Sequence, residues 1–347
     1  MPIQPNVIER TVFFKLNAAP APMLDLVGAL AYQIVSTAVR LNVFAALRER
    51  PSGPGKLAQT LGADERGTRH LLAALAAIGY VSEKDGRYHN TPMTEKWFLD
   101  GAQLDMDAMM TCWDAFLAGL WPHAPEVVRT GERPFDFYEF TARDPALNDA
   151  HQRMMMGNAN MIGPDVVKMV ALPDGASRLL DVGGGHGQFT AYFCAAHLQL
   201  TATILDSEIA LDTARPNMAA AGLSDRVDLY AADLWAAAWG EAWDAVLLFN
   251  LLHHYDLDTN RRLLRKAYDA LRPGGKVAIL DQVAGKQSGP ATNAIVQLVG
   301  FMYYLFADGR TFTRKELTDL LAGAGFHDIQ YHSLRAAPGN GLLVGEK

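Results

Sequence analysis

Residues 179–187 read LLDVGGGHG and give the strongest indication of the fold of this chain. An apolar run ends there in a glycine-rich turn, and a helix is expected from about Gln188 onward. Glycines let the backbone adopt positive φ and approach a ligand closely, and the free N–H groups at the start of a helix attract its polar groups. The stretch therefore predicts a strand, a turn and a helix that place Asp181, Gly183 and Gly185 beside a bound small molecule.

Short apolar runs alternate with helical segments from residue 174 to residue 347. They read RLLDVGG, LTATILD, RVDLYAAD, WDAVLLFN, GKVAILD, HDIQYHS and GLLVGEK. Strands that alternate with helices form mostly parallel sheets with helices on both faces. The sequence thus predicts an α/β, Rossmann-like doubly wound domain over residues 171–347.

The first two strands favour a positively charged nucleoside cofactor. Asp206 ends the second strand, where a carboxylate accepts hydrogen bonds from both ribose hydroxyls. NAD-binding chains share this acid, but the glycines here read G-x-G-x-G and not the G-x-G-x-x-G that cradles a pyrophosphate. Asp181 precedes the glycines and suits a ligand that carries an ammonium or sulfonium group.

The next two strands complete the predicted site. Asp233 and Leu234 follow the third strand, where such folds bind adenine, although an aspartate there also serves as a helix N-cap. The fourth strand leads into Asn250, which we expect at the cofactor, and then into His253 and His254. Because open α/β sheets bind ligands at this carboxyl edge, one histidine is expected at the reacting group; a polar loop is the alternative.

The N-terminal part has a different pattern. Residues 24–47 predict a helix, and two further helices with a β-hairpin then give the order of a winged helix. A DNA-reading helix presents several cations, whereas residues 65–78 offer only Arg66, Arg69 and His70. With a net charge of -7 for the whole chain, we expect no nucleic-acid partner.

Two segments are rich in methionine and aromatic residues. Residues 106–170 predict a helical connector containing Trp113, Phe116 and Met154, and residues 299–306 contain Phe301 and Met302. Such residues usually form a buried core. The alternative is that these five, with His254, line the pocket of a flat apolar substrate.

Cysteine usage and hydropathy indicate the compartment. Cys112 and Cys194 are the only cysteines, which leaves no disulfide framework and no cysteine-rich zinc site. The N-terminus lacks a signal-peptide pattern, and no segment reaches 18 uninterrupted apolar residues. We expect a cytoplasmic protein without a membrane span.

Taken together, these motifs resemble the class I S-adenosylmethionine-dependent O-methyltransferases, the family of plant caffeate-type and bacterial polyketide-tailoring enzymes. The resemblance covers residues 24–347 and rests on the LLDVGGGHG turn, Asp206, the Asp233-Leu234 pair, LLHHYD, LRPGGKVAILD and RKELTDLLAGAGF. It implies S-adenosyl-L-methionine as cofactor, with the turn glycines, including Gly187, at its amino-acid part, Asp206 at the ribose, and Asp233 and Leu234 at the adenine. It also implies a homodimer formed through residues 1–105.

The resemblance assigns the proton transfer as well. The family's L-H-D-W segment matches here so that His253 stands in the position of the general base and His254 where an aspartate is common. Asp281 matches the first of two acidic residues that orient the base, whereas no carboxylate stands near Thr311, where the second is expected. Asp308 is the nearest acid in sequence. A metal site at the two histidines is disfavoured, because adjacent side chains point apart in most backbone conformations.

The sequence therefore predicts an enzyme that methylates a hydroxyl group of a small, aromatic secondary metabolite. The alternatives are an enzyme of the same scaffold with C- or N-methylation, or with hydroxylation, decarboxylation or cyclisation in place of methylation. A winged-helix regulator that senses a ligand is a third class. The expected divisions are residues 1–105 for dimerisation, 106–170 for the connector and 171–347 for cofactor binding and catalysis.

Overall fold

The computed structural model describes residues 5–99, 104–285 and 289–347. The chain divides into two compact units, Met1–Asp114 and Ala115–Lys347. The boundary lies inside helix α7 (Met106–Gly119). The three-part division expected from the sequence is finer than this and stays a prediction.

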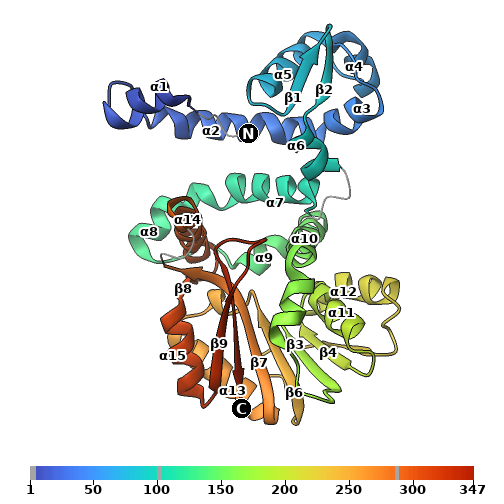
Figure 1. Cartoon of the computed structure of the whole chain (residues 1–347), viewed down its shortest axis with the longest axis vertical. Coiled ribbons are helices and arrows are strands. Elements are labelled where there is room, and N and C mark those ends of the chain that lie inside the picture. Colours follow the sequence, from blue (N-terminus) through green and yellow to red (C-terminus); the bar gives the residue numbers. More distant parts are fainter. Residues whose placement is uncertain (1–4, 100–103, 286–288) are drawn as a thin grey trace. The chain divides into compact units, whose positions relative to one another are not determined.

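The first unit contains the predicted winged-helix elements (Figure 1). In chain order they are α1 (Val7–Arg10), η1 (Thr11–Lys15), α2 (Met23–Arg40), α3 (Val43–Glu49), α4 (Pro54–Leu61), α5 (Glu65–Ala77), β1 (Val81–Lys84), β2 (Arg87–Asn90), α6 (Pro92–Thr94) and η2 (Glu95–Leu99). Strands β1 and β2 pair antiparallel, with Val81 opposite Asn90. The left-handed residues Asp85 and Gly86 form the turn between them. The order of α4, α5 and the hairpin confirms the winged-helix pattern.

The single helix expected over residues 24–47 is wrong, because the chain forms α2 and α3 there instead. Asn42 lies between them in the left-handed region, with φ 56°. A right-handed helix cannot continue through that conformation, which asparagine adopts more readily than most residues. After the break, Phe44 and Leu47 of α3 pack into the core of this unit with Leu72 of α5.

The N-terminal helices carry an exposed apolar face. Its large side chains are 49% to 81% exposed: Val7, Ile8, Phe14, Leu16, Met23, Leu26 and Leu30. Across the described ranges, no single helix is both long and apolar enough to cross a bilayer; α2 and α3, bent by 58° at their junction, satisfy length and composition only as a pair.

Helices of the second unit precede its sheet. After α7 come η3 (Trp121–His123), α8 (Ala124–Thr130), α9 (Phe137–Ala142) and α10 (Pro145–Val170). Asp136 and Asp144 cap α9 and α10 by accepting hydrogen bonds from first-turn N–H groups. The predicted helical connector is confirmed in its secondary structure.

The sheet has the predicted mostly parallel topology. Its elements in chain order are β3 (Arg178–Val182), α11 (Gln188–Ala196), β4 (Thr201–Asp206), α12 (Glu208–Ala220), β5 (Val227–Ala231), β6 (Trp243–Phe249), η4 (Leu252–His254), α13 (Leu257–Ala270), β7 (Leu271–Ala284), α14 (Pro290–Ala307), β8 (Phe312–Thr313), α15 (Arg314–Ala324), β9 (His327–Ser333) and β10 (Asn340–Glu346). The strand order is β5-β4-β3-β6-β7-β10-β9, in which β10 pairs antiparallel with both β7 and β9 and the other pairs along this path are parallel. The two-residue strand β8, which pairs with β7, is an element that the sequence pattern did not indicate.

Alternate residues of the central strands enter two separate cores. On β6, Leu247 and Phe249 pack toward α10, α11 and α12, whereas Val246 and Leu248 pack toward α13 and α15 (Figure 1). All seven residues of β6 are buried, as expected for a strand covered on both faces. These two layers fix the carboxyl ends of β3, β4 and β6, where the predicted site residues lie.

Candidate active site

The glycine turn after β3 has the geometry that its sequence predicts. Gly183 and Gly185 have φ of 71° and 47°, and α11 begins at Gln188. A Cβ on Gly185 would stand 3.1 Å from the Gln152 Oε1 atom of α10, and one on Gly183 would stand 3.2 Å from the Leu251 side chain. Glycine at these two positions lets the turn adopt positive φ and pack closely between α10 and the end of β6.

Two carboxylates flank this turn at the ends of β3 and β4. Asp206 accepts hydrogen bonds from the backbone N–H of Gly185 at 2.8 Å and of Ser207 at 2.7 Å, and burial raises its pKa. Asp181 is 2% exposed and accepts a hydrogen bond from the Thr190 hydroxyl at 2.6 Å. Burial raises the pKa of Asp181 to about 7. Repulsion from Asp206 also raises this pKa, whereas the hydrogen bond from Thr190 lowers it. A cationic group bound at the turn would meet two acids in a poorly hydrated place.

The remaining predicted cofactor residues lie on the following strand ends. Asp233 Oδ1 accepts hydrogen bonds from Trp235 N at 2.9 Å and Ala236 N at 2.8 Å. Asp233 therefore caps backbone N–H groups, as the alternative interpretation expected, but at a turn and not at a helix. Leu234 is partly buried beside it. Asn250 ends β6 in the left-handed region with φ 52°, and such strained residues gather at functional sites.

The structure brings His253 and Asp281 together in a buried pair. His253 Nδ1 lies 2.7 Å from Asp281 Oδ1, and the backbone N–H of His253 donates to Asp281 Oδ2 at 3.1 Å. The two residues are 4% and 1% exposed. Since a carboxylate only accepts, the proton of the neutral ring sits on Nδ1, which leaves the lone pair of Nε2 for an incoming proton. Within the described ranges Nε2 has no hydrogen-bond partner.

An aromatic ring lies flat against this histidine. The Tyr303 ring of α14 has its centroid 3.9 Å from that of His253, with only 8° between the planes. Burial holds the pKa of the Tyr303 hydroxyl well above its usual value, so the ring stays neutral. Sequence reasoning missed Tyr303, although it stands in the aromatic run of residues 299–306.

His254 has a different environment from that of its neighbour. Its Nε2 and the Tyr138 hydroxyl of α9 are 2.9 Å apart in a hydrogen bond, while Nδ1 is buried without a partner among the residues described. Burial, reinforced by His253 and His151, keeps the pKa of His254 well below its usual value. The ring centroids of His253 and His254 are 4.2 Å apart, so the expectation that adjacent histidines point apart is wrong here. In the described ranges no group of three His, Cys, Asp or Glu side chains could hold a metal ion.

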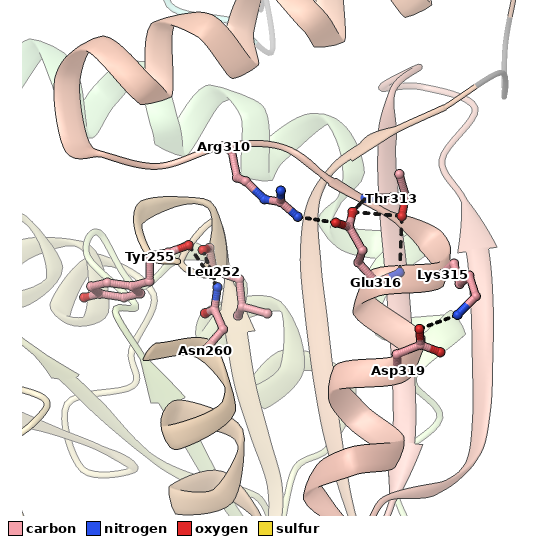
Figure 2. A network of polar contacts seen from close by, with 8 residues as sticks. All are labelled: Leu252, Tyr255, Asn260, Arg310, Thr313, Lys315, Glu316 and Asp319. Atoms are coloured by element: carbon pink, nitrogen blue, oxygen red, sulfur yellow. Dashed lines mark hydrogen bonds and ion pairs between the residues drawn. The ribbon is translucent and has the colours of Figure 1, made fainter. Parts of the chain in front are cut away.

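Two further contacts hold the turn that carries both histidines. Asn260 of α13 donates from Nδ2 to the carbonyl oxygens of Leu252 at 3.0 Å and Tyr255 at 3.2 Å (Figure 2). From the other side, Arg310 N donates to the His253 carbonyl at 3.0 Å. The Arg310 guanidinium in turn pairs with Glu316, which also closes the capping box of α15 with Thr313 (Figure 2). Asn260 was not indicated by any sequence motif.

The second acid expected to orient the base is absent from this place. Thr311 packs against Gly300, because a Cβ added to Gly300 would stand 2.8 Å from the Thr311 hydroxyl oxygen. Asp308 pairs with Arg133 at 2.6 Å, and its side chain is 74% exposed. Asp308 therefore does not take over the missing role, and Asp281 is the one acid hydrogen-bonded to His253 among the residues that the structure describes.

The predicted substrate-binding residues fall in separate environments. Phe116 is 3% exposed and packs against Phe137 and Phe306. This environment agrees with the interpretation of Phe116 as a core residue. Phe301 of α14 is 39% exposed, with Trp121 at 6.1 Å between ring centroids. Met154 of α10 and Met302 of α14 are partly buried. Trp113 belongs to the first unit.

Comparisons with known proteins agree with this geometry. A family model described as an O-methyltransferase domain matches residues 126–327, and one described as an O-methyltransferase dimerisation domain matches residues 25–100. A 3-hydroxy-5-methyl-1-naphthoate 3-O-methyltransferase of Streptomyces sahachiroi is 29% identical over 94% of this chain and 95% of its own. An L-tyrosine C(3)-methyltransferase of Streptomyces lavendulae is 27% identical, over 87% and 85%.

Solved structures share the fold over almost the whole chain. The S-adenosylmethionine-dependent methyltransferase SibL in its apo form is 28% identical, with a TM-score of 0.72 over 94% of this chain and 99% of that one. The two family models together extend over more than half of the described residues. The chain therefore belongs to the O-methyltransferase family, and it is an S-adenosylmethionine-dependent O-methyltransferase with the dimerisation domain of that family.

Proposed function

We propose that the enzyme methylates a phenolic hydroxyl of a small aromatic secondary metabolite, with His253 as the general base. The observation that carries this proposal is the pairing of His253 Nδ1 with Asp281, which leaves Nε2 without a hydrogen-bond partner among the residues that the structure describes. The name of the naphthoate-methylating relative supports an aromatic acceptor. Removal of a phenolic proton requires a base within hydrogen-bond reach of the hydroxyl.

The residues around the glycine turn fit the cofactor. Gly183 and Gly185 present backbone without side chains of their own, and Asp181 and Asp206 supply negative charge beside them. When bound, S-adenosylmethionine supplies an electrophilic methyl group on a sulfonium. We assign its amino-acid part to Asp181, Gly183 and Gly185, its ribose to Asp206, and its adenine to Asp233 and Leu234, with Asn250 at the rim.

The chain's own residues would then do three things for the reaction. Asp281 fixes the tautomer of His253 and stabilises the ring once it is protonated. Nε2 of His253 receives the proton of the acceptor hydroxyl. Positioning the acceptor oxygen in line with the methyl group supplies much of the rate, and we assign this to Met154, His254, Phe301 and Met302.

Methylation at carbon is the second candidate. It is supported by the relative named as an L-tyrosine C(3)-methyltransferase. The experiment is incubation of the full-length enzyme with S-adenosylmethionine carrying a ¹³C methyl group and a panel of hydroxynaphthoates and phenols. The carbon shift of the transferred methyl group separates an aryl ether from an aryl methyl, and a His253→Ala variant with undiminished O-methylation would remove the base from the mechanism.

We also propose a homodimer formed through the first unit. The exposed apolar face of α1, η1 and α2 is larger than single scattered residues explain, and the dimerisation-domain match supports a second copy as its cover. Light scattering on the wild type and on a Leu26→Glu, Leu30→Glu double variant tests this, since a monomeric wild type would contradict it. A cytoplasmic location stays a prediction.

A further inference from the structure

The base in this chain is oriented by fewer carboxylates than the sequence resemblance implies. Asp281 fixes the position of the His253 Nδ1 atom, but one hydrogen bond leaves the imidazole free to tilt about the axis through that contact. The expected second acid is absent, because Thr311 has no carboxylate and Asp308 pairs with Arg133. Something else must fix the plane of the ring if Nε2 is to meet the acceptor in one direction.

Tyr303 covers one face of that ring. The parallel stack, with centroids 3.9 Å apart and 8° between planes, leaves little room for the imidazole to tilt. Helix α14 holds Tyr303 from a position well separated in sequence, with the preceding Val296 and the following Leu305 and Phe306 buried. The stack is therefore built by tertiary packing and does not follow from local chain geometry.

The stack also bears on the charge that forms during the reaction. When His253 takes a proton it becomes an imidazolium, and a cation is stabilised over the face of an aromatic ring. The other titratable groups that face His253 are Asp281 of β7 and His254 of η4, with Tyr138 beyond His254. Arg310 of the α14–α15 segment contributes its backbone N–H, while its guanidinium is engaged by Glu316.

We propose that Tyr303 is a positioning residue for the base. Its ring fixes the plane of the His253 imidazole, a role that a second carboxylate would otherwise have. This rests on the proposed function of His253. The ring, and not the hydroxyl, carries the effect, since the contact is face to face. Phenylalanine at position 303 should therefore keep the orientation of the His253 ring. Leucine and methionine, which fill similar space without an aromatic face, should lose it.

The test measures the His253 ring directly and needs no acceptor. Full-length protein with ¹³C-labelled histidine rings is titrated by NMR as wild type and as Tyr303→Phe, Tyr303→Leu and Tyr303→Met, with His253→Gln to assign the signal. We expect Tyr303→Phe to keep the wild-type titration midpoint. Leucine and methionine should each weaken proton binding by about threefold and broaden the ring signal. Two aliphatic variants guard against one that fails to fold.

Each result has a defined meaning. Wild-type midpoints and line shapes in both aliphatic variants would overturn the proposal, and so would a Phe variant as impaired as the Leu variant. Turnover of 3-hydroxy-5-methyl-1-naphthoate is the second readout, with kcat expected to fall in the aliphatic variants while the affinity for S-adenosylmethionine stays unchanged. If His253→Ala retained turnover while the NMR shifts appeared, the proposed function would fail and the stacking role would stand.

Discussion

The carbonyl oxygen of His253 occupies the space that a side chain on Gly309 would need. A Cβ built on Gly309 overlaps that oxygen and also crowds the Cα atom of His254. The next residue, Arg310, donates its backbone N–H to the same carbonyl. The segment after α14 therefore supports the turn that carries His253 by direct backbone contact, and glycine is required at 309 by lack of space.

A Gly309→Ala substitution should displace the turn and impair catalysis. A shift of about 1 Å in a reacting group can cost about 100-fold in rate, so we expect kcat to fall by one to two orders of magnitude. Calorimetry should show unchanged affinity for S-adenosylmethionine. The control is Gly323→Ala on α15, where an added Cβ meets nothing within 4 Å. Equal kcat in the two variants would contradict the close contact.

The sequence predicted the elements that carry the proposed cofactor site better than the contacts that surround His253. Local patterns mark the glycine turn, Asp206 and the His253 segment, because each follows a strand directly in the chain. Tyr303 and Asn260 reach His253 and its turn from helices α14 and α13, and no spacing rule connects them to it. The break at Asn42 was missed for a similar reason, since one left-handed residue leaves the apolar periodicity nearly intact.

Asn260 should contribute to stability and to catalysis together. Its side chain is fully buried and donates to the carbonyl groups of Leu252 and Tyr255, in the turn that carries His253. An Asn260→Ala variant leaves both acceptors without their donor and opens a small cavity, which we expect to cost about 2 to 3 kcal/mol of unfolding free energy. Urea unfolding and kcat are measured side by side. Lys315→Ala, which breaks an exposed pair with Asp319, is the control and should change neither (Figure 2).

Acid should destabilise the fold through His186. This side chain is 7% exposed, accepts the Gln188 N–H on Nδ1, and has its pKa lowered by burial to about 4. Between about pH 6.5 and pH 4 the unfolded chain binds a proton here that the folded chain does not, so stability falls as the pH falls.

The effect is up to about 3 kcal/mol, and His186→Asn should reduce the pH dependence because an asparagine oxygen can accept the same N–H without titrating. Thermal melts from pH 7 to pH 4 check this. Parallel pH profiles for the two proteins would show that His186 is not the group responsible.

Asp181 should couple cofactor binding to proton release. Its pKa, raised by burial to about 7, means that a large fraction of the free enzyme carries a proton on this carboxyl at neutral pH. If the ammonium of S-adenosylmethionine binds beside it, the ionised form is favoured and the proton leaves. Affinity should therefore rise about fivefold between about pH 6 and pH 7 and then level off.

Isothermal titration in two buffers of different ionisation enthalpy measures the released proton. Asp181→Asn, whose amide oxygen can still accept from Thr190, should bind more weakly and lose the pH dependence. Methylthioadenosine, which lacks the amino-acid part, should bind the wild type with an affinity that does not depend on pH. A pH dependence of equal size for methylthioadenosine would place the titrating group at the nucleoside, with Asp206 as the first alternative. It would contradict the assignment of Asp181 to the ammonium group of the cofactor.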